Sequence, residues 1–336
     1  MINIDVAIPI LNEEDSLEEC IDSIIALKIP NHCEITIYLI DGGSKDNSVK
    51  IIEQYVKKYN NVFFIENKKK LASAAMNLVI LKGKGDYILR LDAGNVYDED
   101  YLVNCHKTSI KYNAANVGGI VETVAGSKAY GSKLVQAIMS HPFGVGNSKF
   151  RTGSKNEVRA DTVPFGFFKK SIFREVGNFN ENLLRAQDYE LNSRIIKSGN
   201  EIWLNPMIKA KYFTLTFWKF IKKNLLLEGP YNAYMWYVSP HTFSIRHSIT
   251  LFFTLGVIGG ILFSHLSSII FYIYISVLIL YFLLSIYFSI TLAISNNEVR
   301  HIFVLPFSFF CFHFLHGLGV LTGVINIIFR NTPFDK

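Results

Sequence analysis

The sequence predicts an α/β protein with a doubly wound, mostly parallel sheet, followed by helices that cross a membrane. Apolar strand-like runs alternate with amphipathic helical segments over residues 1–120, which is the pattern of strand–helix–strand units joined by right-handed crossovers. Charged residues then disappear, since no Asp, Glu, Lys or Arg occurs from residue 247 to residue 297. The sequence therefore predicts a globular part followed by an apolar part.

The alternating region is expected to contain four strands, at residues 5–10, 34–40, 62–65 and 86–91. Helices are expected between them, beginning near residue 14, after the turn at residues 41–46, and at residue 71. From residue 120 to residue 215 the periodicity weakens, and Gly, Pro, Phe and Lys dominate. We expect loops and short strands there, forming the side of the protein that receives an acceptor substrate.

Three apolar segments follow, at residues 248–264, 269–294 and 302–329. A bilayer core requires about 20 apolar residues, so the first two are predicted to span, whereas the third either spans or re-enters. The predicted domains are a globular domain at 1–215, an interfacial segment at 216–247 and a membrane domain of two to three helices at 248–329.

The charge distribution favours a membrane surface as partner. The net charge is +6, and basic residues gather before the apolar part at Lys219, Lys222, Lys223 and Arg246, as in segments that bind anionic lipid head groups. No basic helix with interleaved aromatic residues occurs, so no nucleic-acid partner is expected. The four cysteines have no CxxC spacing, and the N-terminus has no basic stretch before an apolar run. We therefore expect free thiols and a cytoplasmic N-terminal domain on a multi-pass protein of the cell membrane.

Polar residues follow three of the predicted strands: Asn12 and Glu13 after the first, Asp41 after the second and Asp92 after the fourth. Ligands of parallel sheets bind beyond the carboxyl ends of the strands. Carboxylates there contact a nucleotide, or hold a Mg²⁺ or Mn²⁺ ion together with substrate phosphates. The alternative is that each Asp only forms a turn or caps a helix.

Other motifs narrow the choice of function. No GxxxxGK[ST] motif or complete dinucleotide-binding glycine fingerprint is present. His313 and His316 lie one turn apart in an apolar segment, which favours hydrogen bonds between membrane helices. Asp188 lies in a segment that resembles a helix start, where acidic residues are favoured. It could alternatively accept a proton from an attacking hydroxyl group.

Taken together, these motifs resemble the family 2 glycosyltransferases, which have the GT-A fold. The matching segments are residues 8–13 (IPILNE), 41–46 (DGGSKD), 71–77 (LASAAMN) and 90–93 (RLDA). The ExoA-type succinoglycan glucosyltransferases are the closer likeness. Their signatures are similar to residues 141–151 (HPFGVGNSKFR), 161–166 (DTVPFG) and 187–191 (QDYEL).

The resemblance implies roles for individual residues. Asp188 would be the catalytic base, and Asp92 would be the metal-proximal Asp of the DxD motif. The donor would be bound by Pro9, Asn12, Glu13, Asp41, Asp46, Asn77, Arg90 and Asp92. The acceptor side would include Asn147, Arg151, Asp161, Gly166 and Gln187. Two positions depart from the pattern: Gly94 replaces the second Asp of DxD, so fewer carboxylates hold the metal or Asn95 helps, and Gln187 stands where many relatives have Glu.

The implied reaction is an inverting transfer of a hexose, glucose by the nearest likeness, from a UDP-sugar donor. The implied acceptor is a lipid-linked oligosaccharide on a polyprenyl diphosphate, in extracellular or capsular polysaccharide biosynthesis. A divalent metal ion, Mg²⁺ or Mn²⁺, would be the cofactor. The lipid bilayer and a polysaccharide-assembly complex would be further partners.

Other functions remain open at this stage. A polyprenyl-phosphate sugar synthase shares the same fold and motifs, and differs only in its acceptor loops. A non-catalytic membrane scaffold would be consistent with Gly94. A processive polysaccharide synthase is disfavoured because the QxxRW motif is absent from the sequence, and a transporter would leave the first 240 residues unexplained.

Overall fold

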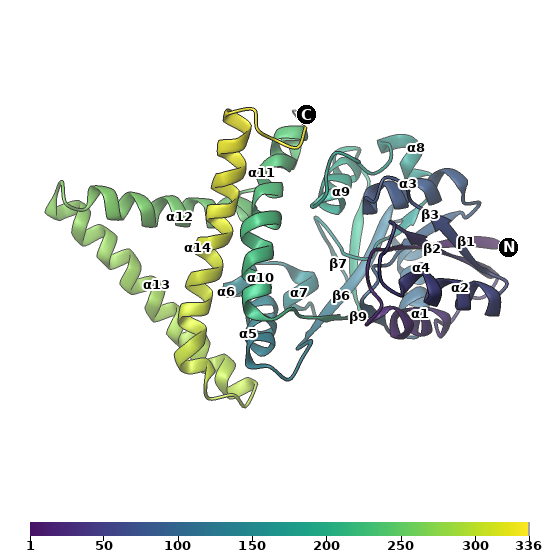
Figure 1. The fold of residues 1–336 in the computed structure, drawn as a ribbon, viewed down its shortest axis with the longest axis horizontal. Helices are drawn as coiled ribbons and strands as arrows, with labels where there is room; N and C mark the ends of the chain where they lie inside the picture. The colour runs from purple at the N-terminus through teal and green to yellow at the C-terminus, as the bar shows by residue number, and fades with distance from the viewer. Residues whose placement is uncertain (335–336) are drawn as a thin grey trace. The chain divides into compact units, whose positions relative to one another are not determined.

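The computed structural model describes residues 1–334 and divides into two compact units (Figure 1). Unit 1 contains residues 1–122 and 149–213, and unit 2 contains residues 123–148 and the chain from residue 214 onward. The globular domain predicted at 1–215 is thus interrupted by a segment that packs with the C-terminal helices. The predicted boundaries at 215 and 247 stay predictions.

Unit 1 is built on a nine-stranded mixed sheet with the order β3-β2-β1-β4-β8-β6-β9-β5, to which β7 adds by pairing with β9. The first four strands are parallel where they pair, as predicted, and have the bounds Ile2–Ile10 (β1), Cys33–Asp41 (β2), Val62–Glu66 (β3) and Tyr87–Arg90 (β4). The other strands are Asn95–Tyr97 (β5), Asn116–Val124 (β6), Val158–Arg159 (β7), Phe167–Lys169 (β8) and Ile202–Phe213 (β9). Antiparallel pairs join β4 to β8, β6 to β8, and β5 and β7 to β9.

The helices of unit 1 cover both faces of this sheet. They are Leu17–Ile25 (α1), Ser48–Lys58 (α2), Ala72–Lys82 (α3), Tyr101–Tyr112 (α4), Lys149–Thr152 (α7), Ile172–Val176 (α8) and Gln187–Lys197 (α9). Alternate residues of β1 enter different cores, because successive strand side chains point to opposite faces. Ile4, Val6 and Ile8 pack with α1 and α2, whereas Ala7 packs with α3.

The expectation of loops and short strands at residues 120–215 is wrong for two elements. Strand β9 has 12 residues, and Tyr130–Ser140 (α5) is a helix of 11 residues. Leu134, Val135 and Ile138 of α5 are buried against Leu305 and Phe309, far along the chain. The local sequence does not reveal this partner.

Unit 2 is helical. Besides α5 it contains Pro142–Val145 (α6), Phe217–Lys223 (α10), the π-helical turn Asn224–Glu228 (η1), Gly229–Val238 (α11), the 3₁₀ turn Pro240–Thr242 (η2), Ile245–Phe263 (α12), Ser268–Ser295 (α13) and His301–Ile328 (α14). By length and composition, α12, α13 and α14 could each cross a membrane. Each predicted apolar segment is therefore one continuous helix, and Pro306 does not end α14.

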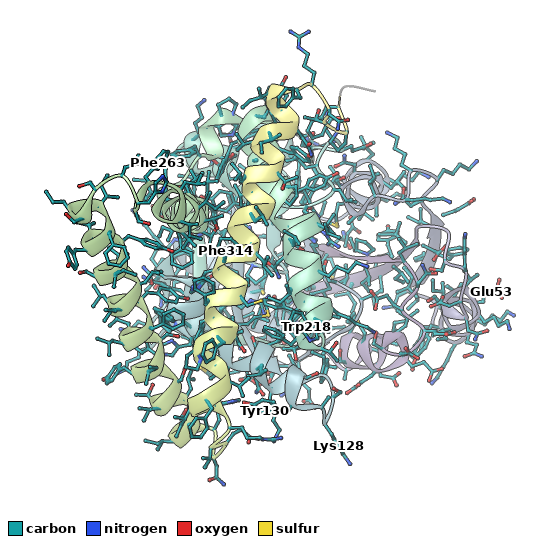
Figure 2. All side chains as sticks on the ribbon, turned by 60° about the vertical axis from the view of Figure 1, so that its left-hand side comes forward. Glu53, Lys128, Tyr130, Trp218, Phe263 and Phe314 are labelled. Carbon is teal, nitrogen blue, oxygen red and sulfur yellow. The ribbon has the colours of Figure 1, made fainter. Side chains whose placement is uncertain are left out.

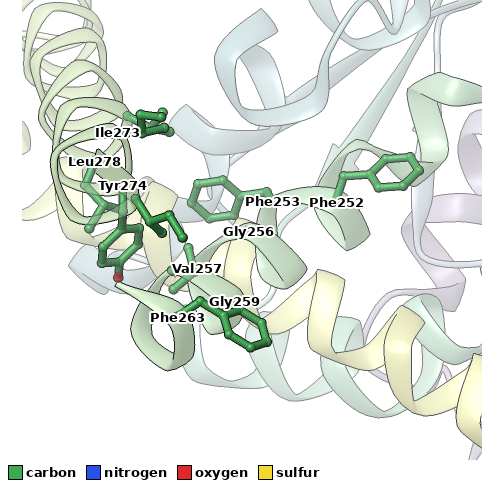
Figure 3. A pocket seen from close by; sticks show the side chains of 12 residues that line it. Phe252, Phe253, Gly256, Val257, Gly259, Phe263, Ile273, Tyr274 and Leu278 are labelled. Atoms are coloured by element: carbon green, nitrogen blue, oxygen red, sulfur yellow. The ribbon is translucent and has the colours of Figure 1, made fainter. Parts of the chain in front are cut away.

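The long helices of unit 2 enclose an apolar hollow and are joined by side-chain hydrogen bonds. An apolar hollow of about 560 Å³ lies between α12 and α13, lined among others by Phe253, Val257 and Tyr274 (Figure 3). The predicted interhelical hydrogen bonds of the two histidines are confirmed. His313 bonds to Tyr281 at 2.9 Å, and His316 bonds to Thr250 at 2.9 Å.

Asp5 is a buried carboxyl group in the middle of the sheet. It is 2% exposed, and its Oδ2 accepts a hydrogen bond of 2.7 Å from the Gly85 amide. Burial, with the nearby Asp86 as a minor contribution, raises the pKa of Asp5 above its usual 3.8 despite the Gly85 bond and Lys170. Ionised Asp5 therefore costs folding free energy.

We expect Asp5→Asn to unfold at a higher temperature than wild type at pH 7. A raised carboxyl pKa destabilises the folded state above that pKa, and the penalty is lost as the pH falls to the ordinary value. The gain should therefore shrink as the pH approaches 4. Thermal unfolding of the full chain in detergent at both pH values checks this, with the exposed Asp15→Asn as control. A lower unfolding temperature for Asp5→Asn at pH 7 would contradict it.

Candidate active site

Backbone and side-chain hydrogen bonds join the loops that follow β1 and β2. Asn12 has the left-handed backbone conformation that Asn tolerates well, with φ of 54°. Its amide donates to Ser44 Oγ at 2.9 Å, and its Oδ1 accepts from the Lys45 amide at 2.8 Å. The Glu13 amide donates to Ser48 Oγ at 2.9 Å. Two of the predicted polar clusters therefore lie side by side at the carboxyl edge of the sheet.

Asp41 and Asp46 shape the second of these loops. Asp41 is 3% exposed, and its carboxylate accepts hydrogen bonds from the amides of Gly43 and Ser44. Asp46 accepts from the amides of Ser48 and Glu14. Both carboxylates thus act as turn formers, which for Asp41 is the alternative raised from the sequence. Their contact with a donor stays a prediction, as does that of Pro9, which lies in β1 beside Ile40 of β2.

The end of β4 carries the central arrangement of charge. Arg90 and Asp92 are two residues apart, and Arg90 donates from Nη2 to Asp92 Oδ1 at 3.0 Å. The same guanidinium forms an ion pair through Nη1 with Asp188 Oδ1. The Arg90 side chain is only 6% exposed, whereas those of Asp92 and Asp188 are 43% and 33% exposed. Two carboxylates open to a ligand therefore share one buried cation.

Asp188 stands in the first turn of α9, as the sequence predicted. The residue before this helix, Ala186, has a left-handed backbone with φ of 62°, and Gln187 is buried. Further along the helix Glu190, 2% exposed, pairs with Arg194 at 2.7 Å. Arg194 also donates to the carbonyls of residues 176–178. This clamp holds α9 against the preceding loop and so fixes Asp188.

Asn77 on α3 provides a second clamp. Its Nδ2 donates to the Phe179 carbonyl at 3.0 Å and to Glu181 Oε1 at 2.8 Å, and its Oδ1 accepts from the Phe179 amide at 2.9 Å. Lys69 pairs with the same Glu181 at 2.6 Å. In this structure Asn77 therefore positions the segment before α9, and its predicted donor contact stays a prediction.

Gly166 lies on the other flank of Arg90. Its carbonyl accepts the Arg90 amide at 2.9 Å, and a Cβ at this position would approach Asn116 Oδ1 to 2.5 Å. The preceding Phe165 has φ of 49°, a strained conformation for a bulky residue, and its carbonyl accepts from the buried Tyr101 hydroxyl at 2.8 Å. Gly166 thus supports the site through its backbone.

The remaining predicted acceptor-side residues are not gathered at one place by the contacts described. Asn147 is exposed and belongs to unit 2. Arg151, in unit 1, lies over the Tyr212 ring at 4.7 Å, and Asp161 is exposed. Their predicted contacts with an acceptor stay predictions.

The residues near Asp92 fit a divalent cation. The donor set is hard oxygen, because Glu13 Oε2 lies 3.1 Å from where a Cβ of Gly94 would be, so this carboxylate approaches the position that the second DxD carboxylate leaves vacant. Asn95 is 6% exposed, and its Oδ1 has no hydrogen-bond partner among residues 1–334. No cluster of three or more His, Cys, Asp or Glu suited to a metal occurs in that range, so substrate phosphates would complete the coordination.

Buried groups below this edge keep their protons. Tyr97 is fully buried, which raises its phenol pKa well above 10, and its hydroxyl bonds the amide and carbonyl of Asp92 at 2.8 and 2.9 Å. Burial, together with the charges of Asp92 and Glu13, raises the pKa of the Cys20 thiol to about 12. Tyr97 is therefore a fixed hydrogen-bond partner of the Asp92 peptide, and Cys20 supplies no thiolate.

Residues 5–177, just over half of the chain, match the family model "Glycosyl transferase family 2". The chain belongs to this family, and it is a glycosyltransferase with the GT-A fold. This confirms the family, fold class and enzyme class predicted from the motifs.

Two relatives extend the comparison beyond this domain. This chain is 26% identical to a protein of Methanococcus voltae, dolichyl N-acetyl-alpha-D-glucosaminyl phosphate 3-beta-D-2,3-diacetamido-2,3-dideoxy-beta-D-glucuronosyltransferase. The match covers 96% of this chain and 97% of that relative. The chain is 29% identical to succinoglycan biosynthesis protein ExoA of Rhizobium meliloti, over 62% of each chain. The first likeness includes the C-terminal helices.

A solved structure shows the same fold across nearly the whole chain. The mannosyltransferase PcManGT from Pyrobaculum calidifontis, in complex with GDP-Man and Mn²⁺, matches 98% of this chain and 88% of its own, with a TM-score of 0.64. The sequences are 11% identical, so this likeness concerns the fold alone.

Sequence reasoning missed the contacts that assemble the site. Arg90 was expected only as a donor ligand, and its spacing of two from Asp92 at the end of β4 was the available signal for their contact. The approach of Glu13 to Gly94 carries no local signal, because the two residues are far apart in the sequence. The bonds of Tyr97 to Asp92 depend on the short turn between β4 and β5, which no motif predicts.

We expect Tyr97→Phe to lower the free energy of unfolding by roughly 1–3 kcal/mol, because it leaves the Asp92 amide without its buried partner. We also expect weaker Mn²⁺-dependent donor binding, since the Asp92 loop is released. Tyr55→Phe is the matched control: it removes a buried hydroxyl that bonds Asp22 at 2.6 Å, away from the site, and should lower stability without altering Mn²⁺-dependent binding. Calorimetric titration with UDP-sugar and Mn²⁺ measures this, and unchanged affinity in Tyr97→Phe would refute the role of Tyr97.

Proposed function

We propose that this chain transfers a hexose from a UDP-sugar to a lipid-linked oligosaccharide acceptor, with inversion at the anomeric carbon. The observation that carries this proposal is the shared guanidinium of Arg90, which draws Asp92 and Asp188 to one place. One carboxylate follows a strand at the ligand-binding edge of the sheet, and the other opens a helix. This pairing suits a donor diphosphate and an acceptor hydroxyl that meet between them.

In the proposed reaction the acceptor hydroxyl oxygen forms a bond to the anomeric carbon as the bond from that carbon to the UDP oxygen breaks. Asp188 accepts the hydroxyl proton, and UDP leaves with the electron pair of the broken bond. Asp92, with Glu13 close to it, would hold the divalent ion, which when bound neutralises charge on the diphosphate. Arg90 keeps Asp188 oriented and supplies buried positive charge beside it.

The acceptor class rests on two observations. The Methanococcus voltae relative, similar over nearly its full length, is named for a dolichyl phosphate substrate. Three helices in this chain are long and apolar enough for a membrane, which brings the enzyme to a lipid-borne substrate. A sugar joined directly to polyprenyl phosphate is the second candidate, since the same two observations suit a polyprenyl-linked substrate of either kind.

A panel of labelled nucleotide sugars, incubated with membranes that contain the chain and followed by lipid extraction, tests donor and acceptor together. We expect label from a UDP-hexose in a lipid-linked oligosaccharide that resists mild acid at the new bond. Label released by mild acid as free sugar would indicate a sugar–phosphate bond and favour the second candidate. No labelled lipid with any donor would contradict the proposal.

We expect Asp188→Asn to lower the transfer rate by about 10²–10⁴-fold, because proton acceptance by a positioned base contributes that much. The donor affinity should stay within about twofold, since the removed charge faces the acceptor. Transfer assays and donor titration measure the two effects separately, with Glu53→Gln on the exposed face of α2 as control. Near-normal turnover in Asp188→Asn would exclude it as the base.

A further inference from the structure

Contacts within unit 2 indicate which of its three long apolar helices cross a bilayer. These contacts are independent of the sugar that the enzyme transfers. The segment 123–148 leaves unit 1 and returns to it, and its longest helix, α5, has 11 residues. Such a helix is roughly 16 Å long, too short for a hydrocarbon core of about 30 Å. α5 and α6 therefore lie on the same side of the membrane as unit 1.

The loop that joins α13 to α14 lies on this side as well. Glu298 in this loop pairs with Lys133 of α5 at 3.0 Å, and His301 Nδ1 bonds to the Tyr130 hydroxyl at 3.1 Å. The paired cations Arg300 and Lys133 hold the pKa of Glu298 low, at about 2, so the pair stays charged at neutral pH. α14 therefore begins on the side of the catalytic domain.

The rest of α14 lies along the helix formed by α10, η1 and α11 (Figure 1). The rings of Phe220 and Phe312 are 5.1 Å apart, and Tyr234 accepts a hydrogen bond of 2.9 Å from Asn326. These pairs are 14 residues apart on both helices, so the two helices run in the same direction. Between them the backbones nearly touch: a Cβ on Gly319 would lie 2.5 Å from the Leu225 carbonyl oxygen. The two helices therefore share one orientation toward the membrane.

The composition of α10–α11 disfavours a crossing. It carries Lys219, Lys222 and Lys223 near its start and Glu228 near its middle, and a charged side chain at the centre of a bilayer costs about 3 kcal/mol. Lys219 and Lys222 are exposed, and Trp218 beside them is 72% exposed (Figure 2). Exposed Trp and Lys together are typical of the head-group region. α10–α11 thus fits the surface of a bilayer, and α14 must lie there with it.

One face of α14 is buried on the protein, including Leu305, Phe309 and Val320. The opposite face exposes apolar side chains, at Phe303, Phe307, Ile325 and Ile328. In its most apolar window 44% of residues are buried, compared with 17% in α12 and 6% in α13. This asymmetry is typical of a helix that packs on the protein through one face and contacts lipid through the other.

α12 and α13 each contact α14 over only part of their length. α12 meets α14 as far as its own middle, where Thr254 donates to the Phe314 carbonyl at 2.9 Å, and the second half of α13 meets α14 at Tyr281. α12 then leads away from α14, and its far end packs on α13, where a Cβ on Gly260 would collide with the Tyr274 ring (Figures 1 and 3). The two helices are roughly 28 and 42 Å long, enough to cross as a hairpin.

We propose that this chain crosses the membrane twice, through the α12–α13 hairpin, and that α14 lies with α10–α11 in the plane of the membrane surface on the catalytic side. The lipid surface is thus the partner of a platform formed by α10, α11 and α14. The third apolar segment, left open by the sequence, is an interfacial helix that does not cross.

Single-cysteine variants of the full chain test this in oriented membrane vesicles with a membrane-impermeant maleimide. The native cysteines are replaced first, and Asn331→Cys then reports the end of α14, His265→Cys the hairpin loop and Glu53→Cys unit 1. We expect residues 331 and 53 to be labelled from the same side, and residue 265 from the other side. Labelling of residue 331 together with residue 265 would overturn the proposal, as would labelling of residue 265 together with residue 53.

A second measurement uses the wild-type sequence, and so does not require the cysteine variants to fold. Green fluorescent protein and alkaline phosphatase, active on opposite sides of a bacterial inner membrane, are fused after the last residue of the wild-type chain and, separately, before its first. Two crossings require both ends to favour the same reporter. Opposite reporters at the two ends would require an odd number of crossings and would overturn the proposal, whether or not transfer is detected.

Discussion

One buried cation organises this enzyme's candidate site. Arg90 is almost fully enclosed, and it can be accommodated only because two carboxylates, Asp92 and Asp188, meet it from different parts of the chain. An unpaired guanidinium there would cost several kcal/mol, so the fold must bring both acids to it. The carboxylates, in turn, remain partly open to solvent. The same ion pairs that satisfy Arg90 therefore place two acidic groups at the mouth of the site.

The surrounding elements serve this arrangement. Parallel strands β1, β2 and β4 end at one edge, which brings the Asn12–Glu13 loop against the Asp41 turn and Glu13 close to Gly94. Asn77 and Arg194 both hold the segment that precedes α9 and Asp188, and the Tyr97 hydroxyl bonds the peptide of Asp92. Asn77 and Tyr97 are buried, Arg194 is 21% exposed, and all three side chains are hydrogen-bonded, which makes the site rigid. Catalysis by positioning and electrostatics requires such rigidity.

The parallel half of the sheet and the site edge could be predicted from the sequence, because both follow from local patterns: apolar strands, amphipathic helices and polar residues at strand ends. The antiparallel half could not, since β5, β7 and β8 have two or three residues each and form only through distant partners. For the same reason α5 was missed, because its apolar face packs on α14. Asp188 was assigned from a resemblance, and its contact with Arg90, 98 positions away in sequence, required the tertiary structure. Apolar length likewise does not separate a spanning helix from an interfacial one, and the neighbours of α14 were needed.

A double-mutant cycle tests the shared cation most directly. Asp92→Asn and Asp188→Asn each leave Arg90 with one carboxylate, whereas the double variant leaves it buried with none. Unfolding of the full chain in detergent should therefore show a loss in the double variant that exceeds the sum of the single losses by about 1–3 kcal/mol. Strictly additive losses would mean that the two carboxylates do not depend on one guanidinium, and would contradict the account.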